Sequence, residues 1–191
     1  MKIISGFLGG REIRTVAGKG MRPAMGRTRE SLFSMLEARG FVWENARVLD
    51  LFAGGGSLGL ECVSRGAAEA VLVESSRPVV SGLTVSVAEL GVGDKCRVVQ
   101  ENVIRFLRSY PPSPFNVIFI DPPYRENLAR PVFKLLSGAW MAPGCFVVAE
   151  LEPDADPEAP PCLEKLVARQ FGQTSLSIWR KDEDSPLPGD I

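Results

Sequence analysis

Two short stretches of the chain contain residues whose types and spacing could do chemistry. In the first, DLFAGGGSLG (50–59), three glycines have the G-x-G-x-x-G spacing of a dinucleotide-binding turn, and Glu74 follows about 20 residues after the first of them. Asp50 precedes this loop, and its negative charge would contribute little beside a pyrophosphate. The glycine spacing alone therefore does not decide which ligand the loop holds.

The second stretch is FIDPPY (119–124), which ends an apolar run. Two consecutive prolines fix the backbone and remove two N–H donors, which leaves carbonyl oxygens free to accept hydrogen bonds from a ligand. Asp121 adds a carboxylate acceptor and Tyr124 an aromatic ring, and base–aromatic stacking contributes roughly 1–3 kcal/mol per base. This combination predicts a site for a planar amine, although a bare Pro-Pro pair more often only stiffens a turn.

Apolar periodicity predicts the elements that must position these residues. A helix is expected near 27–39, where Leu32, Phe33 and Leu36 recur at helical spacing and should enter the core. Strands and helices then alternate. The expected strands are 46–52, 69–74, 96–100, 115–121 and 145–151, and the expected helices are 57–66, 76–91, 103–110 and 127–137.

This alternation, with nearly continuous apolar strands, predicts an α/β fold whose parallel sheet is covered on both faces. Right-handed crossovers make it a doubly wound, Rossmann-like sheet with a ligand crevice at the C-terminal ends of the strands. Asp50, Glu74 and Asp121 all lie at such ends. Two runs around Gly172 predict a closing antiparallel hairpin, and the tail 182–191 is expected to be disordered.

The composition excludes several classes of site. The chain has 191 residues, 45% of them hydrophobic, which suffices for one well-buried domain, and it contains no histidine. Histidine-based zinc sites, Ser-His-Asp triads and Cys-His dyads are therefore excluded, and we expect no metal site. The four cysteines are far apart, as is typical of core residues in a reducing compartment. No apolar run reaches roughly 20 residues, so we expect a cytoplasmic protein without a membrane span.

Charge is distributed unevenly along the chain. Residues 1–39 contain eight basic and three acidic residues, whereas the net charge of the whole chain is −1. We therefore predict a basic N-terminal arm that contacts a polyanion, although a solvated charged arm explains the same count equally well.

The motifs together resemble a family. DPPY is similar to the [N/D]-P-P-[Y/F] motif of S-adenosylmethionine-dependent methyltransferases that modify exocyclic amines, and DLFAGGGSLG resembles their cofactor loop. The stretches RPAMGRTRESLFSML, LVESSR and FGQTSLSIWR occur in the order found in the RsmD-type methyltransferases. Those enzymes methylate the exocyclic amine of a guanine in 16S ribosomal RNA. The resemblance spans nearly the whole chain.

The resemblance implies a role for each motif. It implies a class I methyltransferase domain over residues 41–181, S-adenosylmethionine as cofactor, and an RNA-contacting arm and helix over residues 1–40. The implied partner is ribosomal RNA, free or within a partly assembled small subunit, and the protein is expected to be a monomer. The implied cofactor-binding residues are Asp50, Phe52, Gly54, Gly56, Glu74, Asn102 and Val103. The implied catalytic residues are Asp121, Pro122, Pro123 and Tyr124. The implied RNA-binding residues are Arg11, Arg22, Arg27 and Arg29.

Some alternatives remain open in the sequence. Glu74 could be a charge that merely ends a strand, and Asn102 could be a turn residue before a helix. The chain also departs from the family pattern at Gly55, where the family has serine, and at residues 24–26, which replace two hydroxyl residues and an aspartate. An adenine-N6 methyltransferase acting on DNA or RNA, and a catalytically silent RNA-binding assembly factor, are the competing hypotheses.

Overall fold

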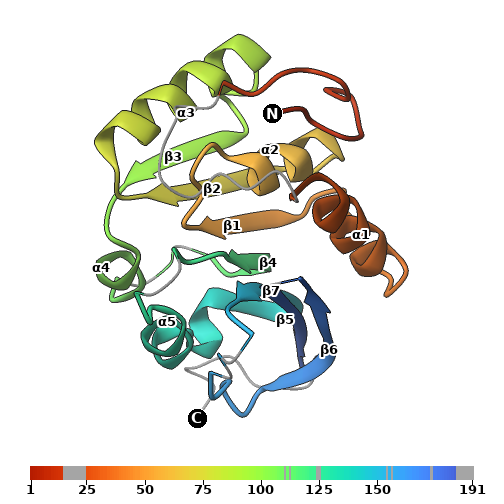
Figure 1. Ribbon diagram of the computed structural model, residues 1–191, viewed down its shortest axis with the longest axis vertical. Helices are drawn as coiled ribbons and strands as arrows, with labels where there is room; N and C mark the ends of the chain where they lie inside the picture. Colours follow the sequence, from red (N-terminus) through yellow and green to blue (C-terminus); the bar gives the residue numbers. More distant parts are fainter. Residues whose placement is uncertain are drawn as a thin grey trace.

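The computed structural model describes residues 1–14, 25–109, 111, 113–123, 126–153, 155, 157–172 and 174–183, with 25–28 described by their backbone alone. Within these ranges, seven strands form one mixed sheet in the order β3-β2-β1-β4-β5-β7-β6 (Figure 1). The strands are β1 (Arg47–Leu51), β2 (Glu69–Glu74), β3 (Cys96–Gln100), β4 (Phe115–Ile120), β5 (Met141–Leu151), β6 (Leu163–Phe171) and β7 (Thr174–Lys181). The helices are α1 (Met25–Glu37), α2 (Ser57–Ser64), α3 (Arg77–Leu90), α4 (Val103–Leu107), α5 (Ala129–Leu135) and the 3-10 turn η1 (Gly138–Trp140).

Strands β1 to β5 pair in parallel, and β7 runs antiparallel to both β5 and β6. This confirms the predicted mostly parallel, doubly wound sheet with a C-terminal antiparallel hairpin. Two boundaries differ from the prediction by more than two residues. β5 begins at Met141 rather than 145, because Met141 pairs with Phe115 across a register irregularity. α4 ends at Leu107, where the Arg108 N–H bonds to the Arg105 carbonyl and closes the last turn.

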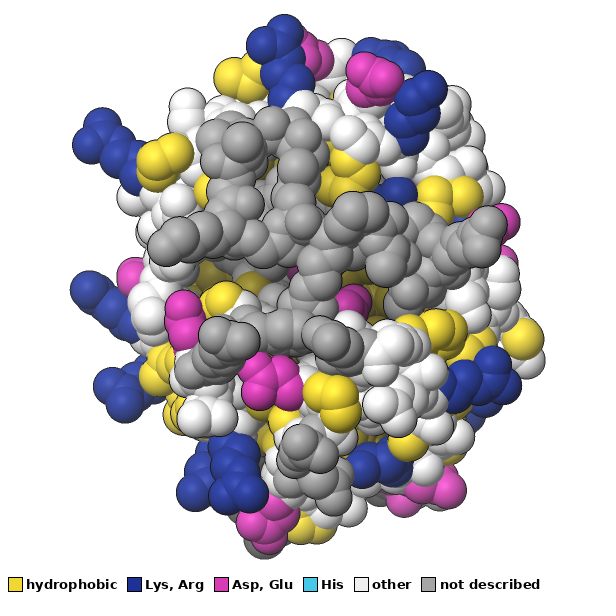
Figure 2. Space-filling view, in the orientation of Figure 1, with side chains coloured by type: hydrophobic (Ala, Val, Ile, Leu, Met, Phe, Trp, Pro, Cys, Tyr) yellow, Lys and Arg dark blue, Asp and Glu magenta, His cyan; other side chains and the backbone are white. Residues whose placement is uncertain are grey.

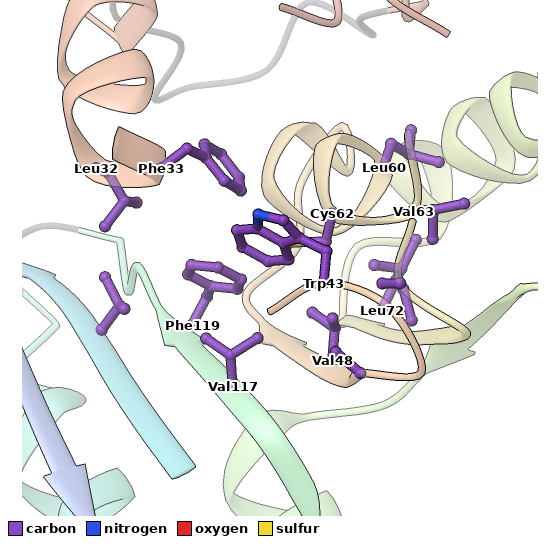
Figure 3. Close-up of a cluster of buried hydrophobic side chains, with 14 of the residues drawn as sticks. Leu32, Phe33, Trp43, Val48, Leu60, Cys62, Val63, Leu72, Val117 and Phe119 are labelled. Carbon is purple, nitrogen blue, oxygen red and sulfur yellow. The ribbon is translucent and has the colours of Figure 1, made fainter. Parts of the chain in front are cut away.

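Helices cover both faces of the sheet, and each face has its own hydrophobic core. Apolar residues of α1, α2 and α3 pack on one face, and those of α4, α5 and η1 pack on the other. Figure 3 shows part of the first core, where Phe33 of α1 points toward Trp43 and toward Phe119 of β4. The centroid of the Phe33 ring lies 5.3 Å from that of Trp43 and 6.2 Å from that of Phe119. The predicted burial of Leu32, Phe33 and Leu36 is confirmed.

The described part of the N-terminal arm, residues 1–14, packs against α2 and α3. Glu61 of α2, which is fully buried, accepts hydrogen bonds from the backbone N–H groups of Ile4 (2.6 Å) and Ser5 (3.0 Å). A Cβ at Gly6 would lie 1.8 Å from the Ser64 carbonyl oxygen, so the arm touches α2 directly. This segment therefore shares its core with the sheet.

None of the helices in these described ranges has the length and apolarity needed to cross a bilayer.

Candidate active site

The C-terminal ends of four neighbouring strands bring the predicted site residues together. Leu51 of β1 pairs with Val73 of β2 and with Ile120 of β4, and Ile120 pairs in turn with Ala149 of β5. The residues that follow these paired positions form a strand-end row by extension of the register. In order across the sheet, they are Glu74, Phe52, Asp121 and Glu150. Neighbouring strands lie about 4.8 Å apart, and one strand separates Glu74 from Asp121. The backbones of these two residues are therefore about 10 Å from each other.

The glycine loop between β1 and α2 has a backbone that ordinary residues rarely adopt. Gly54 and Gly56 have φ angles of 53° and 78°, and Phe52 has a φ of 67°. A Cβ at Gly56 would lie 2.5 Å from Cδ1 of Leu83, so glycine is required there for space as well as for conformation. Positive φ in a bulky residue such as Phe52 is uncommon, and such strain clusters at ligand sites.

Asp50 lies beneath this loop and is almost fully buried, with 2% of its surface exposed. Its Oδ2 accepts a hydrogen bond from the Gly59 N–H at 3.0 Å. A Cβ at Gly59 would lie 2.1 Å from Leu72, so the glycine permits this close approach of α2 to the sheet. Burial raises the pKa of Asp50 to about 7; the Gly59 hydrogen bond opposes the shift and the charge of Glu74 adds to it. The site therefore holds a carboxyl group that is poorly solvated when ionised.

Glu74 joins the loops that follow β1 and β2. Its Oε2 accepts from the Gly54 N–H at 3.1 Å, and its Oε1 accepts from the Ser76 N–H at 2.7 Å. Two backbone donors fix this half-buried carboxylate at the mouth of the glycine loop. Its predicted contact with ribose stays a prediction.

Asn102 caps a helix. Its Oδ1 accepts hydrogen bonds from the backbone N–H groups of Ile104 (3.0 Å) and Arg105 (3.2 Å), which would otherwise lack partners in the first turn of α4. The side chain of Asn102 therefore has the role expected of a turn residue before a helix. Val103 is buried in the second core. The contacts of Asn102 and Val103 with adenine stay a prediction.

The Asp-Pro-Pro segment lies directly after β4, between two cavities. The larger cavity, about 460 Å³, is lined by Pro122 and Pro123 together with residues of α5 and the end of β5. The smaller cavity, about 30 Å³, lies on the α1 side of the sheet and includes Asp121. Tyr124 falls outside the described residues. The larger cavity is within the usual range for small-molecule sites.

The predicted RNA-binding arginines have different environments. Arg11 is exposed, and its Nη2 donates to the Glu89 carbonyl of α3 at 2.9 Å. Arg22 and the side chain of Arg27 lie outside the described part of the chain. Arg29 is only 6% exposed, so it does not lie on an open phosphate-binding surface as expected. Burial lowers the pKa of its guanidinium, and the charge of Glu61 raises it. Most described Lys and Arg side chains seen in Figure 2 lie around the rim of this face.

Sequence reasoning missed Glu150, the fourth member of the strand-end row. Glu150 is half-buried and lines both cavities, beside Asp121. The signal was available, because an acidic residue lies near the end of the predicted strand 145–151, as Asp50, Glu74 and Asp121 do in theirs. In the described ranges, no group of three or more acidic or cysteine side chains could hold a metal ion.

Comparison with solved structures places this geometry in a known class. The structure of yhhF from Escherichia coli superposes with a TM-score of 0.85 at 34% identity, covering 95% of this chain and 98% of that one. An RNA methyltransferase from Salinibacter ruber, solved in complex with S-adenosyl-L-homocysteine, shares the fold at 18% identity, with a TM-score of 0.58 over 85% of this chain and 97% of that one. The fold is that of a class I methyltransferase.

Comparison of sequences identifies the family within this fold class. The family described as Conserved hypothetical protein 95 matches residues 1–180. Ribosomal RNA small subunit methyltransferase D of Escherichia coli K12 is 33% identical over 192 aligned positions, which cover 100% of this chain and 94% of that protein. The chain therefore belongs to this family, that of the RsmD-type methyltransferases, and the predicted resemblance is confirmed.

Proposed function

We propose that this protein transfers a methyl group from S-adenosylmethionine to the exocyclic amine, N2, of a guanine in 16S ribosomal RNA. Its full-length similarity to a ribosomal RNA small subunit methyltransferase supports the class of substrate. The observation that carries the proposal is the strand-end row, in which Glu74 and Asp121 lie on either side of the strained residue Phe52. In this proposal Glu74 binds the cofactor and Asp121 binds the amine, and both acids lie at the same edge of the sheet.

The residues around the glycine loop fit the cofactor. Gly54 and Gly56 let the backbone approach a ligand closely, and the fixed carboxylate of Glu74 can accept from two neighbouring hydroxyl groups. A cationic ligand above the buried Asp50 carboxyl would favour its ionised form, and the ionised carboxylate would in turn stabilise the bound cation. When bound, S-adenosylmethionine supplies an electrophilic methyl carbon, whose bond to sulfur breaks with the electron pair going to sulfur as the new nitrogen–carbon bond forms.

Asp121 and the carbonyl oxygen of Pro122 are the acceptors for the target amine. Neither Pro122 nor Pro123 has a backbone N–H. No backbone donor of these two residues therefore competes with the amine for the acceptors. Two acceptors that hold the two N–H bonds of the amine would direct its lone pair toward the methyl group and stabilise the positive charge that develops on nitrogen. The amine then releases one proton to an acceptor or to water, which completes the reaction without a histidine.

The proposal is tested with purified protein, S-adenosylmethionine and either 16S RNA or small-subunit particles from cells lacking the protein. We expect N2-methylguanosine in the digested product, at one position found by mass mapping. Asp121→Ala should bind the cofactor with normal affinity in calorimetry but lose at least about 100-fold in turnover. Turnover near that of the wild type would refute the role of Asp121.

The same assay separates the competing functions. N6-methyladenosine in place of N2-methylguanosine would indicate an adenine methyltransferase, which DPPY would serve equally well. RNA binding without any methylated product would indicate an assembly factor that retains the fold. Calorimetry with S-adenosylmethionine and NAD side by side tests the dinucleotide interpretation of the glycine loop.

A further inference from the structure

We propose that Glu150 and Arg29 select guanine at this site, with the Glu150 carboxylate accepting from the base N1–H and the Arg29 guanidinium donating to O6. This inference rests on the proposed function and deepens it. It assigns the choice between guanine and adenine to two residues that lie outside both sequence motifs.

Both residues face the small cavity that also contains Asp121. The cavity is lined by Arg29 of α1, Ser57 at the start of α2, and Asp121 and Glu150 at the ends of β4 and β5. Alternation along the strands supports this placement. Phe119 and Val148 lie in the core under α1, and Asp121 and Glu150, each two residues further along, point to the same side of the sheet.

Arg29 is a buried cation with unused donors. Its Nη2 donates to the Lys2 carbonyl at 2.6 Å. Its Nε and Nη1 are buried and, within the part of the chain that the structure describes, have no hydrogen-bond acceptor. The carboxylate of Glu61 stabilises the positive charge of Arg29, but its oxygens accept hydrogen bonds from the Ile4 and Ser5 N–H groups and from Arg65 Nε. Buried guanidinium donors without acceptors are costly, so a ligand acceptor in this cavity would be stabilised.

The dimensions suit one edge of a base. The small cavity, about 30 Å³, has room for roughly one water-sized group, whereas the larger cavity, about 460 Å³, can receive a whole base. Glu150 lines both cavities, so a base bound against Pro122 and Pro123 can present its edge to the Glu150 carboxylate and to Arg29. Enzymes that act on an extruded base commonly read it through hydrogen bonds to its Watson–Crick edge.

Guanine and adenine are opposite in polarity along that edge. From N2 outward, guanine presents an amine donor, the N1–H donor and the O6 acceptor, which match Asp121, Glu150 and Arg29 in turn. Adenine presents a bare N1 lone pair to a carboxylate and an amino group to a guanidinium. Both adenine contacts are repulsive, so the same two residues that accept guanine exclude adenine.

The decisive probe is a base that keeps the reacting amine but reverses the rest of the edge. In 2,6-diaminopurine, N2 is unchanged, N1 carries no hydrogen, and position 6 carries an amino group. This analogue is placed by RNA ligation at the guanine mapped above, in the substrate that the wild type methylates. We expect the wild type to prefer guanosine by at least about 100-fold in kcat/KM.

Glu150→Gln should lower activity on guanosine and narrow this preference by at least about 10-fold, because the glutamine amide can donate to the bare N1. Arg29→Gln should also narrow the preference for guanosine, since the amide oxygen of the new glutamine can accept a hydrogen bond from the amino group at position 6 of 2,6-diaminopurine. Asp121→Asn should slow both substrates without changing their ratio, because both present N2. Glu164→Gln makes the same chemical change at an exposed position of β6 and should leave the ratio unchanged.

The proposed function and the selection role of Glu150 and Arg29 are refuted by different results. If the wild type methylates no guanine, the proposed function is wrong. If it methylates guanine but uses diaminopurine equally well, or if Glu150→Gln slows both substrates by the same factor, only the selection role is wrong. Circular dichroism and thermal melting establish that each variant is folded, and Glu150→Gln alone decides the outcome if Arg29→Gln is unfolded.

Discussion

Replacing Asp50 with asparagine should change how the stability of the ligand-free protein depends on pH. Burial raises the pKa of this carboxyl from 3.8 to about 7, with a further contribution from the charge of Glu74. Between about pH 4 and pH 7 the unfolded chain is ionised at this position, whereas the folded chain keeps its proton. The folded state then binds more protons than the unfolded state, so the contribution of Asp50 to stability falls as the pH rises.

The size of the effect follows from the pKa difference. Each pKa unit corresponds to about 1.4 kcal/mol, so Asp50 lowers the free energy of unfolding by about 4 kcal/mol above pH 7 relative to pH values below 4. Asparagine does not titrate, and its amide oxygen can still accept from the Gly59 N–H. Its buried NH2 group has a cost of about 1–3 kcal/mol if it lacks a partner, but that cost is the same at every pH.

The measurement is urea unfolding of the wild type and Asp50→Asn at pH 5 and pH 8. The difference in free energy of unfolding, variant minus wild type, should rise by about 2.5 kcal/mol between these two pH values. Asp94→Asn, which makes the same change on the exposed surface, serves as the control. Parallel stability curves for Asp50→Asn and the wild type would refute an Asp50 carboxyl that resists ionisation in the folded protein.

Three further outcomes are expected. In urea unfolding, Gly56→Ala should lower the free energy of unfolding by about 2–4 kcal/mol, because alanine is strained at a φ of 78° and its Cβ would press on Leu83. The control Gly10→Ala, at a φ of 82° with open space around it, should lower it by about 1–2 kcal/mol. Equal losses would show that contact with Leu83 does not contribute. Glu61→Gln should lower the free energy of unfolding by about 3 kcal/mol and expose the N-terminal segment to limited proteolysis, since it leaves Arg65 and Arg29 without their buried counter-charge. Glu12→Gln, on the exposed surface, is the control. An unchanged cleavage pattern would contradict the role of Glu61 in anchoring residues 1–14. A thiol reagent should label the native protein at Cys162 alone, because Cys62, Cys96 and Cys145 are buried and burial raises their pKa values; mass spectrometry that finds a second label would show that the fold opens.

Periodicity was sufficient for the sheet because every central strand is apolar on both faces. Val48 and Leu49, for example, enter opposite cores, so the run reads as buried whichever way the strand is turned. The start of β5 was not predictable in the same way. Met141 is followed by Pro143 and Gly144, which argue locally against a strand, and only its pairing with Phe115 makes it one.

The acids at the strand ends were predictable, but their environments were not. Asp50 and Glu74 look alike in the sequence, yet one is 2% exposed beneath α2 and the other is fixed by two backbone N–H groups at the loop mouth. The difference comes from Gly59, which permits the approach of α2 over Asp50. For Asn102 the environment was among the predicted alternatives, because its side chain caps α4 as a turn residue before a helix would. Its contact with the cofactor stays a prediction.

Arg29 shows how counting charges along a segment can mislead. Eight basic residues before position 40 suggest an exposed basic arm, and Arg29 was counted among them. In a helix, however, it precedes Leu32 by three residues, Phe33 by four and Leu36 by seven, so all four lie on one stripe. The apolar residues of that stripe enter the core, and Arg29 must enter with them. A guanidinium drawn into an apolar stripe needs partners inside the protein or from a ligand, and the unused Nε and Nη1 donors beside Asp121 and Glu150 make the ligand the stronger explanation.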